Sequence, residues 1–256
     1  MVRLFNITKR FPVFDDNLNE QIRDELFYAL EDVSFSIQSG EFTIIAGANG
    51  SGKSLLMSII AKLEEPTSGV VETSARVGLV FQEPDAQILG ETPREDIAFG
   101  PRNMQRSFPR KMKLKKSEIN ERVNLALKET GLEQRADFPS RSLSGGEKRR
   151  LAAAGVLAMD AQIIIFDEPY ANMDYPGVVQ VNRLFQKLKN DGKTVIILTH
   201  ELEKCLALAS RFIVLSEGKI VFNGSPSDAL SCSLENWGIH HPLKKAQEKI
   251  EDLLWQ

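Results

Sequence analysis

The chain has 256 residues, of which 42% are hydrophobic and 26% are charged, and its formal net charge is −3. A chain of this size and composition can bury one large core and carry a subdomain. The acidic balance argues against a general nucleic-acid binder, which would normally show a strong basic excess. Cys205 and Cys232 lie in unrelated contexts, which predicts a reduced setting without a structural metal. The longest apolar run, 151–159, is far shorter than the ~20 residues of a spanning helix.

The first 46 residues are expected to form strands around one interruption. Alternating apolar residues in 2–7 and again in 33–37 predict two strands. Between them, the stretch 15–25 is polar and acidic, and we expect a surface loop or a short helix there.

An aromatic ring ahead of residue 47 could stack on a nucleotide base. Phe11, which precedes a proline, is our first candidate, and Phe14 and Tyr28 compete with it. For each of these three rings an ordinary core position is the alternative interpretation.

A short apolar run, 42–46, is followed by a phosphate-binding loop pattern, in which a glycine and four free positions precede Gly-Lys-Ser. The loop consists of Gly47, Ala48, Asn49, Gly50, Ser51, Gly52, Lys53 and Ser54. The run 42–46 reads as a buried strand and 55–63 as a helix, and a tight strand-to-helix turn aims backbone N–H groups at an anion. Lys53 would reach the β- and γ-phosphates and Ser54 would hold Mg²⁺. The sequence therefore predicts a nucleoside triphosphate site.

A further buried strand is expected at 77–81, ending at Gln82. From 83 to about 158 no convincing strand follows, and 118–128 is typical of an amphipathic helix closed by Gly131. This pattern predicts a helical insertion into a strand-rich core.

The stretch 106–116 contains six basic residues. A solvated loop or helix face is the favoured interpretation, and a docking patch for anionic lipid or for a partner is the alternative.

Ser144, Gly145 and Gly146 precede a long helix and are expected at its N-terminus. Backbone amides and the helix dipole suit an anion there. An ordinary turn and helix cap is the competing interpretation of the same three residues.

Four apolar residues, 163–166, predict a fully buried strand that ends in Asp167 and Glu168. Ligands bind at the carboxyl ends of strands in open α/β sheets. One carboxylate can hold Mg²⁺ through water, and the next can polarise a water molecule for attack on the γ-phosphate.

The next buried strand, 194–199, ends at His200, which repeats the position of the two carboxylates. A hairpin of 211–215 and 219–222 is expected to complete the core. In the tail, apolar residues recur at helical spacing between Leu243 and Leu254, which indicates either packing on the core or a dimer contact.

These elements, in this order, resemble the ATP-binding-cassette (ABC) ATPases over essentially the whole chain. The resemblance implies an α/β fold with a P-loop NTPase core, a mixed sheet flanked by helices, from 1–83 and 159–230. It also implies a helical signature subdomain at 84–158 and a C-terminal helical dimerisation segment at 231–256.

The family's roles carry over to matching positions, with ATP and Mg²⁺ as the ligands. Gln82 resembles the glutamine that senses Mg²⁺ and the attacking water, and Glu168 resembles the catalytic base. His200 resembles the switch histidine that contacts the γ-phosphate. The segment 144–146 resembles the signature that covers the ATP of the partner subunit, and Asp174 resembles the aspartate that couples the two sites.

A closer resemblance, carried by 81–87 and 95–103, is to the ATPases of energy-coupling-factor (ECF) importers of vitamins and metal ions. It implies a second ABC ATPase subunit, identical or paralogous, a transmembrane scaffold and a substrate-binding membrane subunit, with no nucleic acid. It places the chain at the cytoplasmic face of the membrane. A soluble cassette ATPase without a transport role, or the ATPase of an ordinary ABC importer, are the alternatives.

Overall fold

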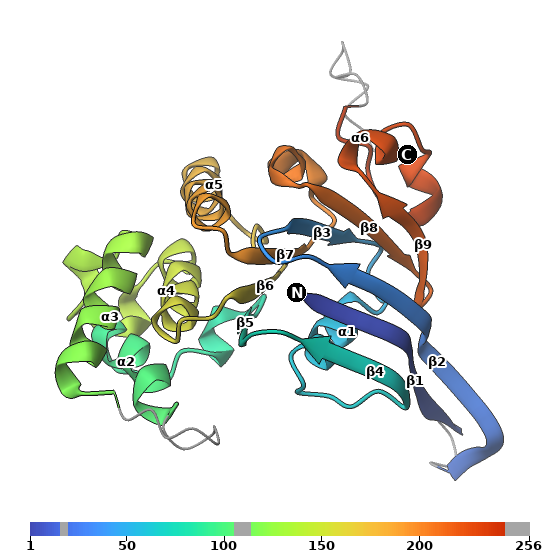
Figure 1. Ribbon diagram of the computed structural model, residues 1–256, viewed down its shortest axis with the longest axis horizontal. Coiled ribbons are helices and arrows are strands. Elements are labelled where there is room, and N and C mark those ends of the chain that lie inside the picture. Colours follow the sequence, from blue (N-terminus) through green and yellow to red (C-terminus); the bar gives the residue numbers. More distant parts are fainter. Residues whose placement is uncertain (16–19, 105–113, 244–256) are drawn as a thin grey trace.

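The computed structural model describes residues 1–15, 20–104 and 114–243, and it contains two sheets (Figure 1). Six strands form a mixed sheet in the order β5-β6-β7-β3-β8-β9, in which β9 alone is antiparallel to its neighbour. Three strands form an antiparallel sheet in the order β2-β1-β4. The strands are β1 (Val2–Asp15), β2 (Glu20–Ile37), β3 (Phe42–Ala46), β4 (Ser68–Thr73), β5 (Val77–Val80), β6 (Ile163–Asp167), β7 (Thr194–Leu198), β8 (Arg211–Ser216) and β9 (Lys219–Gly224).

The helices of the described chain cover the larger sheet or form a group of their own. They are α1 (Lys53–Ile60), α2 (Pro93–Asn103), α3 (Lys116–Thr130), α4 (Gly145–Ala158), α5 (Tyr175–Asn190) and α6 (Pro226–Ala229). The α/β fold with a mixed sheet and flanking helices is the one that the sequence predicts, and the strands expected at 42–46, 77–81, 163–166 and 194–199 are confirmed within one residue.

Every residue of β3, β6 and β7 is buried, because both faces of the sheet are covered. On one face, α1 and the antiparallel sheet pack against alternate residues such as Ile45, Ile165 and Ile196. On the other face, α5 places Phe185 edge-on against Phe166, with the ring centroids 4.8 Å apart. Figure 1 shows α5 and α1 on opposite sides of these strands.

The described part of 84–158 contains helices and no strand, as the sequence predicts. Helices α2, α3 and α4 share a separate core that includes Ile97, Val123 and Leu151. Gly131 closes α3 with a left-handed φ of 64°. These helices lie to one side of the sheets in Figure 1, so the segment before α4 is held on a different layer from α1.

The expectation of a loop or short helix at 15–25 is wrong for residue 15 and for 20–25, and 16–19 lie outside the described residues. Strand β1 continues to Asp15, β2 begins at Glu20, and these two residues are paired in the ladder. The two strands extend beyond the sheet as a two-stranded ribbon, and their cross-strand pairing overrides the polar composition of the stretch. Strand β4, mostly exposed and paired to β1 at the sheet edge, is also absent from the prediction.

Two predicted features lie partly outside the described residues. Of the basic stretch 106–116, only 114–116 is described, and of the C-terminal helical pattern only Leu243 is described. The tail packs on the core as far as Ile239, since Leu234 and Ile239 are buried and the ring centroids of Trp237 and Phe222 lie 6.0 Å apart, whereas Leu243 is exposed. Within the described ranges, no helix is long and apolar enough to cross a membrane.

Candidate active site

The phosphate-binding loop lies between β3 and α1, at the carboxyl end of a central parallel strand. Gly50 and Gly52 adopt left-handed backbone conformations, with φ of 81° and 101°. A Cβ at Gly47 would lie 2.1 Å from the carbonyl oxygen of Leu215, so a side chain has no room there. The buried Ser51 hydroxyl has no hydrogen-bond partner in the described chain. A compact loop with an unpaired buried hydroxyl at the start of a helix is suited to an anion.

Lys53 begins α1 and is 6% exposed. Its Nζ donates hydrogen bonds to the carbonyl oxygens of Gly47 (2.8 Å) and Ala48 (3.0 Å). Burial lowers the pKa of Lys53, and the neighbouring carboxylates of Glu168 and Asp167 partly offset this effect. The ammonium group therefore closes its own loop, and phosphate oxygens can replace these two carbonyls as its acceptors.

The hydroxyl of Ser54, in the first turn of α1, donates a hydrogen bond to Oδ2 of Asp167, the last residue of β6, over 2.9 Å. Burial raises the pKa of Asp167, and the Ser54 hydrogen bond lowers it. A desolvated carboxylate beside a hydroxyl is a set of hard oxygen donors, which fits Mg²⁺. Mg²⁺ sites typically use one or two such protein ligands together with substrate phosphates and water.

Glu168 lies at the centre of a hydrogen-bonded group at the ends of β6 and β7. Its Oε2 accepts a hydrogen bond from Thr199 Oγ1 (3.0 Å), and its Oε1 lies 2.9 Å from His200 Nδ1. Its backbone has a left-handed φ of 42°, and its N–H donates to the carbonyl of Leu198. A carboxylate 7% exposed and fixed by two side chains can accept a proton from a water molecule. Two predicted residues, Glu168 and His200, are thus in direct contact.

Thr199 is the residue of this group that the sequence reasoning missed. It is fully buried, and besides donating to Glu168 it accepts a hydrogen bond from the backbone N–H of Glu201 over 3.1 Å. Its position as the last residue of the apolar run before His200 is a usable signal, because a hydroxyl at a buried strand end needs a partner.

Gln82 follows β5, which pairs in parallel with β6. This pairing brings Gln82 to the same edge of the sheet as Asp167, since the carboxyl ends of parallel strands lie together. Gln82 is exposed, and its backbone carbonyl oxygen accepts a hydrogen bond from the Arg149 guanidinium over 3.4 Å.

The signature segment begins α4. Ser144 caps this helix, with its hydroxyl accepting from the N–H of Glu147 and its own N–H donating to the Glu147 carboxylate over 2.8 Å. These bonds and Arg135 hold the pKa of Glu147 below its usual range. A Cβ added at Gly145 or Gly146 would meet nothing within 4 Å. The start of α4 is therefore a capped, unobstructed helix N-terminus.

The aromatic candidates lie on the β1–β2 ribbon. Phe11 pairs with Phe27 across the two strands, and Phe11 and Tyr28 are 41% and 42% exposed. The ribbon reaches the loop, because the carbonyl of Ala29 lies 2.8 Å from where a Cβ on residue 52 would be. Both exposed rings meet the requirement for stacking on a base, and the side chain of Phe14 lies outside the description.

Asp174 caps the N-terminus of α5 by accepting a hydrogen bond from the N–H of Gly177 over 2.9 Å. The preceding Asn172 adopts a left-handed φ of 56°. This turn follows β6 and Glu168, so the aspartate is tied by a short segment to the hydrogen-bonded carboxylate.

Comparisons with known proteins identify the family to which the chain belongs. The family model described as ABC transporter matches residues 30–171. An energy-coupling factor transporter ATP-binding protein of Carboxydothermus hydrogenoformans is 37% identical over 89% of this chain and 88% of its own length. One from Methanocaldococcus jannaschii is 37% identical over 79% of this chain and 75% of its own length.

Two solved structures are similar as well. The cbiO1 protein of Clostridium perfringens, part of the ABC transporter complex cbiONQ, has a TM-score of 0.73 at 30% identity and covers 90% of each chain. A dimeric ATP-binding cassette in a post-hydrolysis state, bound to ADP and Pi, has a TM-score of 0.74 at 29% identity, over 88% of this chain and 99% of its own. The chain is therefore a member of the ABC transporter family of ATP-hydrolysing cassettes.

Proposed function

We propose that this chain is the ATP-binding subunit of an ECF-type importer, in which two cassettes close head-to-tail on two ATP·Mg²⁺ and drive uptake of a vitamin or metal ion. The observation that carries the proposal is the separation of two anion-binding elements. The loop 47–54 lies with Asp167 and Glu168 at the sheet edge, whereas Ser144 begins α4 in the helical group (Figure 1). A second chain supplies the missing half of each site.

In the closed pair, Lys53 binds the β- and γ-phosphates in place of its two loop carbonyls. Ser54 and Asp167, together with the Gln82 side chain, would hold Mg²⁺, which when bound would supply positive charge to offset that of the phosphates. Glu168 orients the attacking water and accepts its proton. His200 is half-exposed, and it turns from Glu168 toward the γ-phosphate.

Ser144, Gly145 and Gly146 contribute backbone amides and a helix N-terminus to the ATP of the other subunit. Phe11 stacks on adenine, with Tyr28 as the alternative ring. The 51% exposure of the His200 side chain and the open space in front of the two glycines both support an approaching partner.

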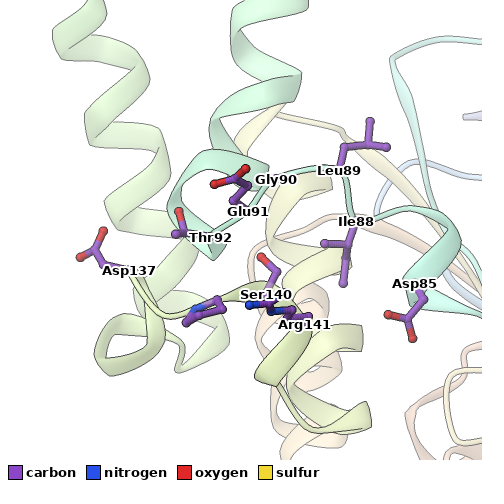
Figure 2. Close-up of a pocket in the computed structure, with 10 residues that line it drawn as sticks. Asp85, Ile88, Leu89, Gly90, Glu91, Thr92, Asp137, Ser140 and Arg141 are labelled. Atoms are coloured by element: carbon purple, nitrogen blue, oxygen red, sulfur yellow. The ribbon is translucent and has the colours of Figure 1, made fainter.

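A membrane subunit would dock beside the segment that follows Gln82. Leu89 is 68% exposed and lines two hollows. One, of about 530 Å³, lies between 85–92 and 137–141, and Figure 2 shows the side chains of both segments around it. The other, of about 490 Å³, includes the half-exposed Phe99. A hollow with exposed apolar side chains suits a short helix from a partner.

Gln87 connects this docking surface to the nucleotide site. Its side chain donates to the carbonyl of Leu79 over 2.8 Å and accepts from the N–H of Phe81 over 3.2 Å. A displacement of 84–89 by a docked partner would therefore be transmitted through Gln87 to the end of β5 and to Gln82. Substituting Gln87 or Leu89 by alanine should uncouple transport from hydrolysis, and variants that transport and hydrolyse normally would refute this path.

The ECF assignment is supported by the names of several relatives, whereas an ordinary ABC importer or a soluble cassette ATPase would have other partners. The test is an affinity pull-down of the tagged chain from detergent-solubilised native membranes, followed by mass spectrometry. Recovery of a transmembrane scaffold with a separate substrate-binding membrane protein supports the proposal and identifies a substrate class. Recovery of ribosomal or nucleic-acid-associated proteins alone contradicts it.

A further inference from the structure

Arg149 lies at the junction of three segments that surround the active site. It is in the second turn of α4, close behind the signature residues, and its guanidinium donates to the carbonyl of Gln82 over 3.4 Å. Burial lowers the pKa of Arg149, and the nearby carboxylate of Glu201 partly offsets this effect. The guanidinium is thus partly desolvated and within the electrostatic reach of a carboxylate next to His200.

Glu201 is bound to the hydrogen-bonded group around Glu168. Its N–H donates to Thr199 Oγ1, the same hydroxyl that donates to Glu168 Oε2. One carboxylate oxygen, Oε1, accepts from Lys204 over 2.5 Å. The other, Oε2, is buried and has no hydrogen-bond partner in the described chain.

The unpaired oxygen of Glu201 has a counterpart on Arg149. The Nε atom of Arg149 is also buried without a hydrogen-bond partner among the described residues. A buried donor and a buried acceptor of opposite charge are costly to leave unpaired, and pairing them in a low-dielectric site recovers that cost. Any small movement of α4 that brings the two groups together would therefore be favourable.

We propose that Arg149 and Glu201 form an ion pair when the cassette closes on ATP, and that this pair fixes the positions of the signature helix, the Gln82 segment and the His200 segment together. The inference rests on the proposed head-to-tail function, because closure is what requires Ser144 to move toward a partner's nucleotide. Arg149 does not contact the nucleotide. It is a positioning residue that acts through the Gln82 backbone and through Glu201.

A purely structural role for the pair makes a different prediction. If Arg149 and Glu201 only stabilised the fold, their coupling would be present in the nucleotide-free monomer. If they pair on closure, the coupling appears only in the closed dimer, since an interaction stabilises only the state in which it forms.

The experiment is a double-mutant cycle with Arg149→Met, Glu201→Gln and the combined variant. Arg150→Met is the matched control, because the neighbouring Arg150 is similarly half-buried and also has a buried Nε without a hydrogen-bond partner among the described residues, but the carboxylate near it is that of Glu147. Two quantities are measured for each variant. These are the dissociation constant of the dimer with a non-hydrolysable ATP analogue, by analytical ultracentrifugation, and the free energy of unfolding of the nucleotide-free chain in urea.

Each single variant should raise the dissociation constant of the nucleotide-dependent dimer by about 10- to 100-fold. The dissociation constant of the combined variant should be no higher than that of the more strongly affected single variant. No coupling should be found in urea, and Arg150→Met should dimerise like the wild type. Additive losses in the dimer, no loss at all, or equal coupling in urea would each overturn the inference.

The cycle also separates this inference from the proposed function. If the wild type, alone or with the cassette that co-purifies with it, forms no nucleotide-dependent dimer, the head-to-tail proposal fails and the inference fails with it. If the wild type dimerises and the losses are additive, only the inference fails.

Discussion

Replacing Thr199 by valine tests the hydrogen-bonded group around Glu168 with almost no change in shape. The substitution removes the donor to the Glu168 carboxylate (3.0 Å) and the acceptor for the Glu201 N–H (3.1 Å) at a fully buried position. A hydrogen bond to a charged group contributes about 1.5–3 kcal/mol, and an unsatisfied buried N–H costs about 1–3 kcal/mol. The added methyl group returns about 0.8 kcal/mol. The net loss of stability should be about 2–5 kcal/mol.

The functional effect should fall on hydrolysis. Glu168 keeps its contact with His200 but loses the one that fixes its other oxygen. If the full contribution of this hydrogen bond, about 1.5–3 kcal/mol, is lost from the transition state, the rate of hydrolysis falls by about 10- to 100-fold. We expect this decrease in kcat with little change in the affinity for ATP, because Lys53 and the loop are untouched.

The assays are urea unfolding, for the free energy, and single-turnover hydrolysis, for the rate after ATP is bound. Thr199→Ser is the control, since it keeps the hydroxyl and removes one methyl group. The reasoning is refuted if the serine variant loses as much hydrolysis as the valine variant, or if Thr199→Val lowers ATP affinity instead of the rate.

Three further predictions concern the backbone, the thiols and the helix cap. Gly52→Ala should lower the free energy of unfolding by about 2–4 kcal/mol and weaken ATP binding, because its φ is 101° and a Cβ there would lie 2.8 Å from the carbonyl oxygen of Ala29. Gly145→Ala is the control and should unfold like the wild type in urea, since a Cβ there meets nothing within 4 Å. In native protein at pH 8, a thiol reagent should label Cys232 well before Cys205, whose pKa burial raises to about 12, and both should react equally in urea. Folding lowers the pKa of Glu147 from 4.5, so the charged carboxylate stabilises the fold above pH 4.5, and this stabilisation is lost as the pH falls through the pKa of the folded state. The stability difference between the wild type and Glu147→Gln should therefore shrink below pH 4.5 when thermal unfolding is measured over a series of acid pH values. A difference that stays constant with pH would contradict the prediction.

The sequence predicts the edge of the central sheet well, because the physical signals are local. Buried apolar runs define β3, β6 and β7, and the polar residues directly after them, such as Asp167 and His200, must lie at their carboxyl ends. The contact between Glu168 and His200 follows from the pairing of β6 with β7, which the order of elements does not by itself reveal.

Other features depend on long-range contacts that leave little trace in the sequence. The polar stretch 15–25 is partly strand because β1 and β2 pair beyond the sheet, and the short edge strand β4 depends on β1. Thr199 suits a strand by its β-branched side chain, so its residue type does not indicate a role, and only its position at the end of a buried run signals that its hydroxyl needs a partner. The unpaired atoms of Arg149 and Glu201 are recognisable only in three dimensions.

The central claim is that each ATP site is shared between two chains, and cross-linking tests it most directly. Asn49 and Ser144 are both exposed, and the claim places the first of one chain opposite the second of the other. With both replaced by cysteine and Cys232 by serine, a short bifunctional thiol reagent should produce a covalent dimer only when ATP is present. A cross-link within one chain, or a dimer that forms equally without ATP, would contradict the shared site.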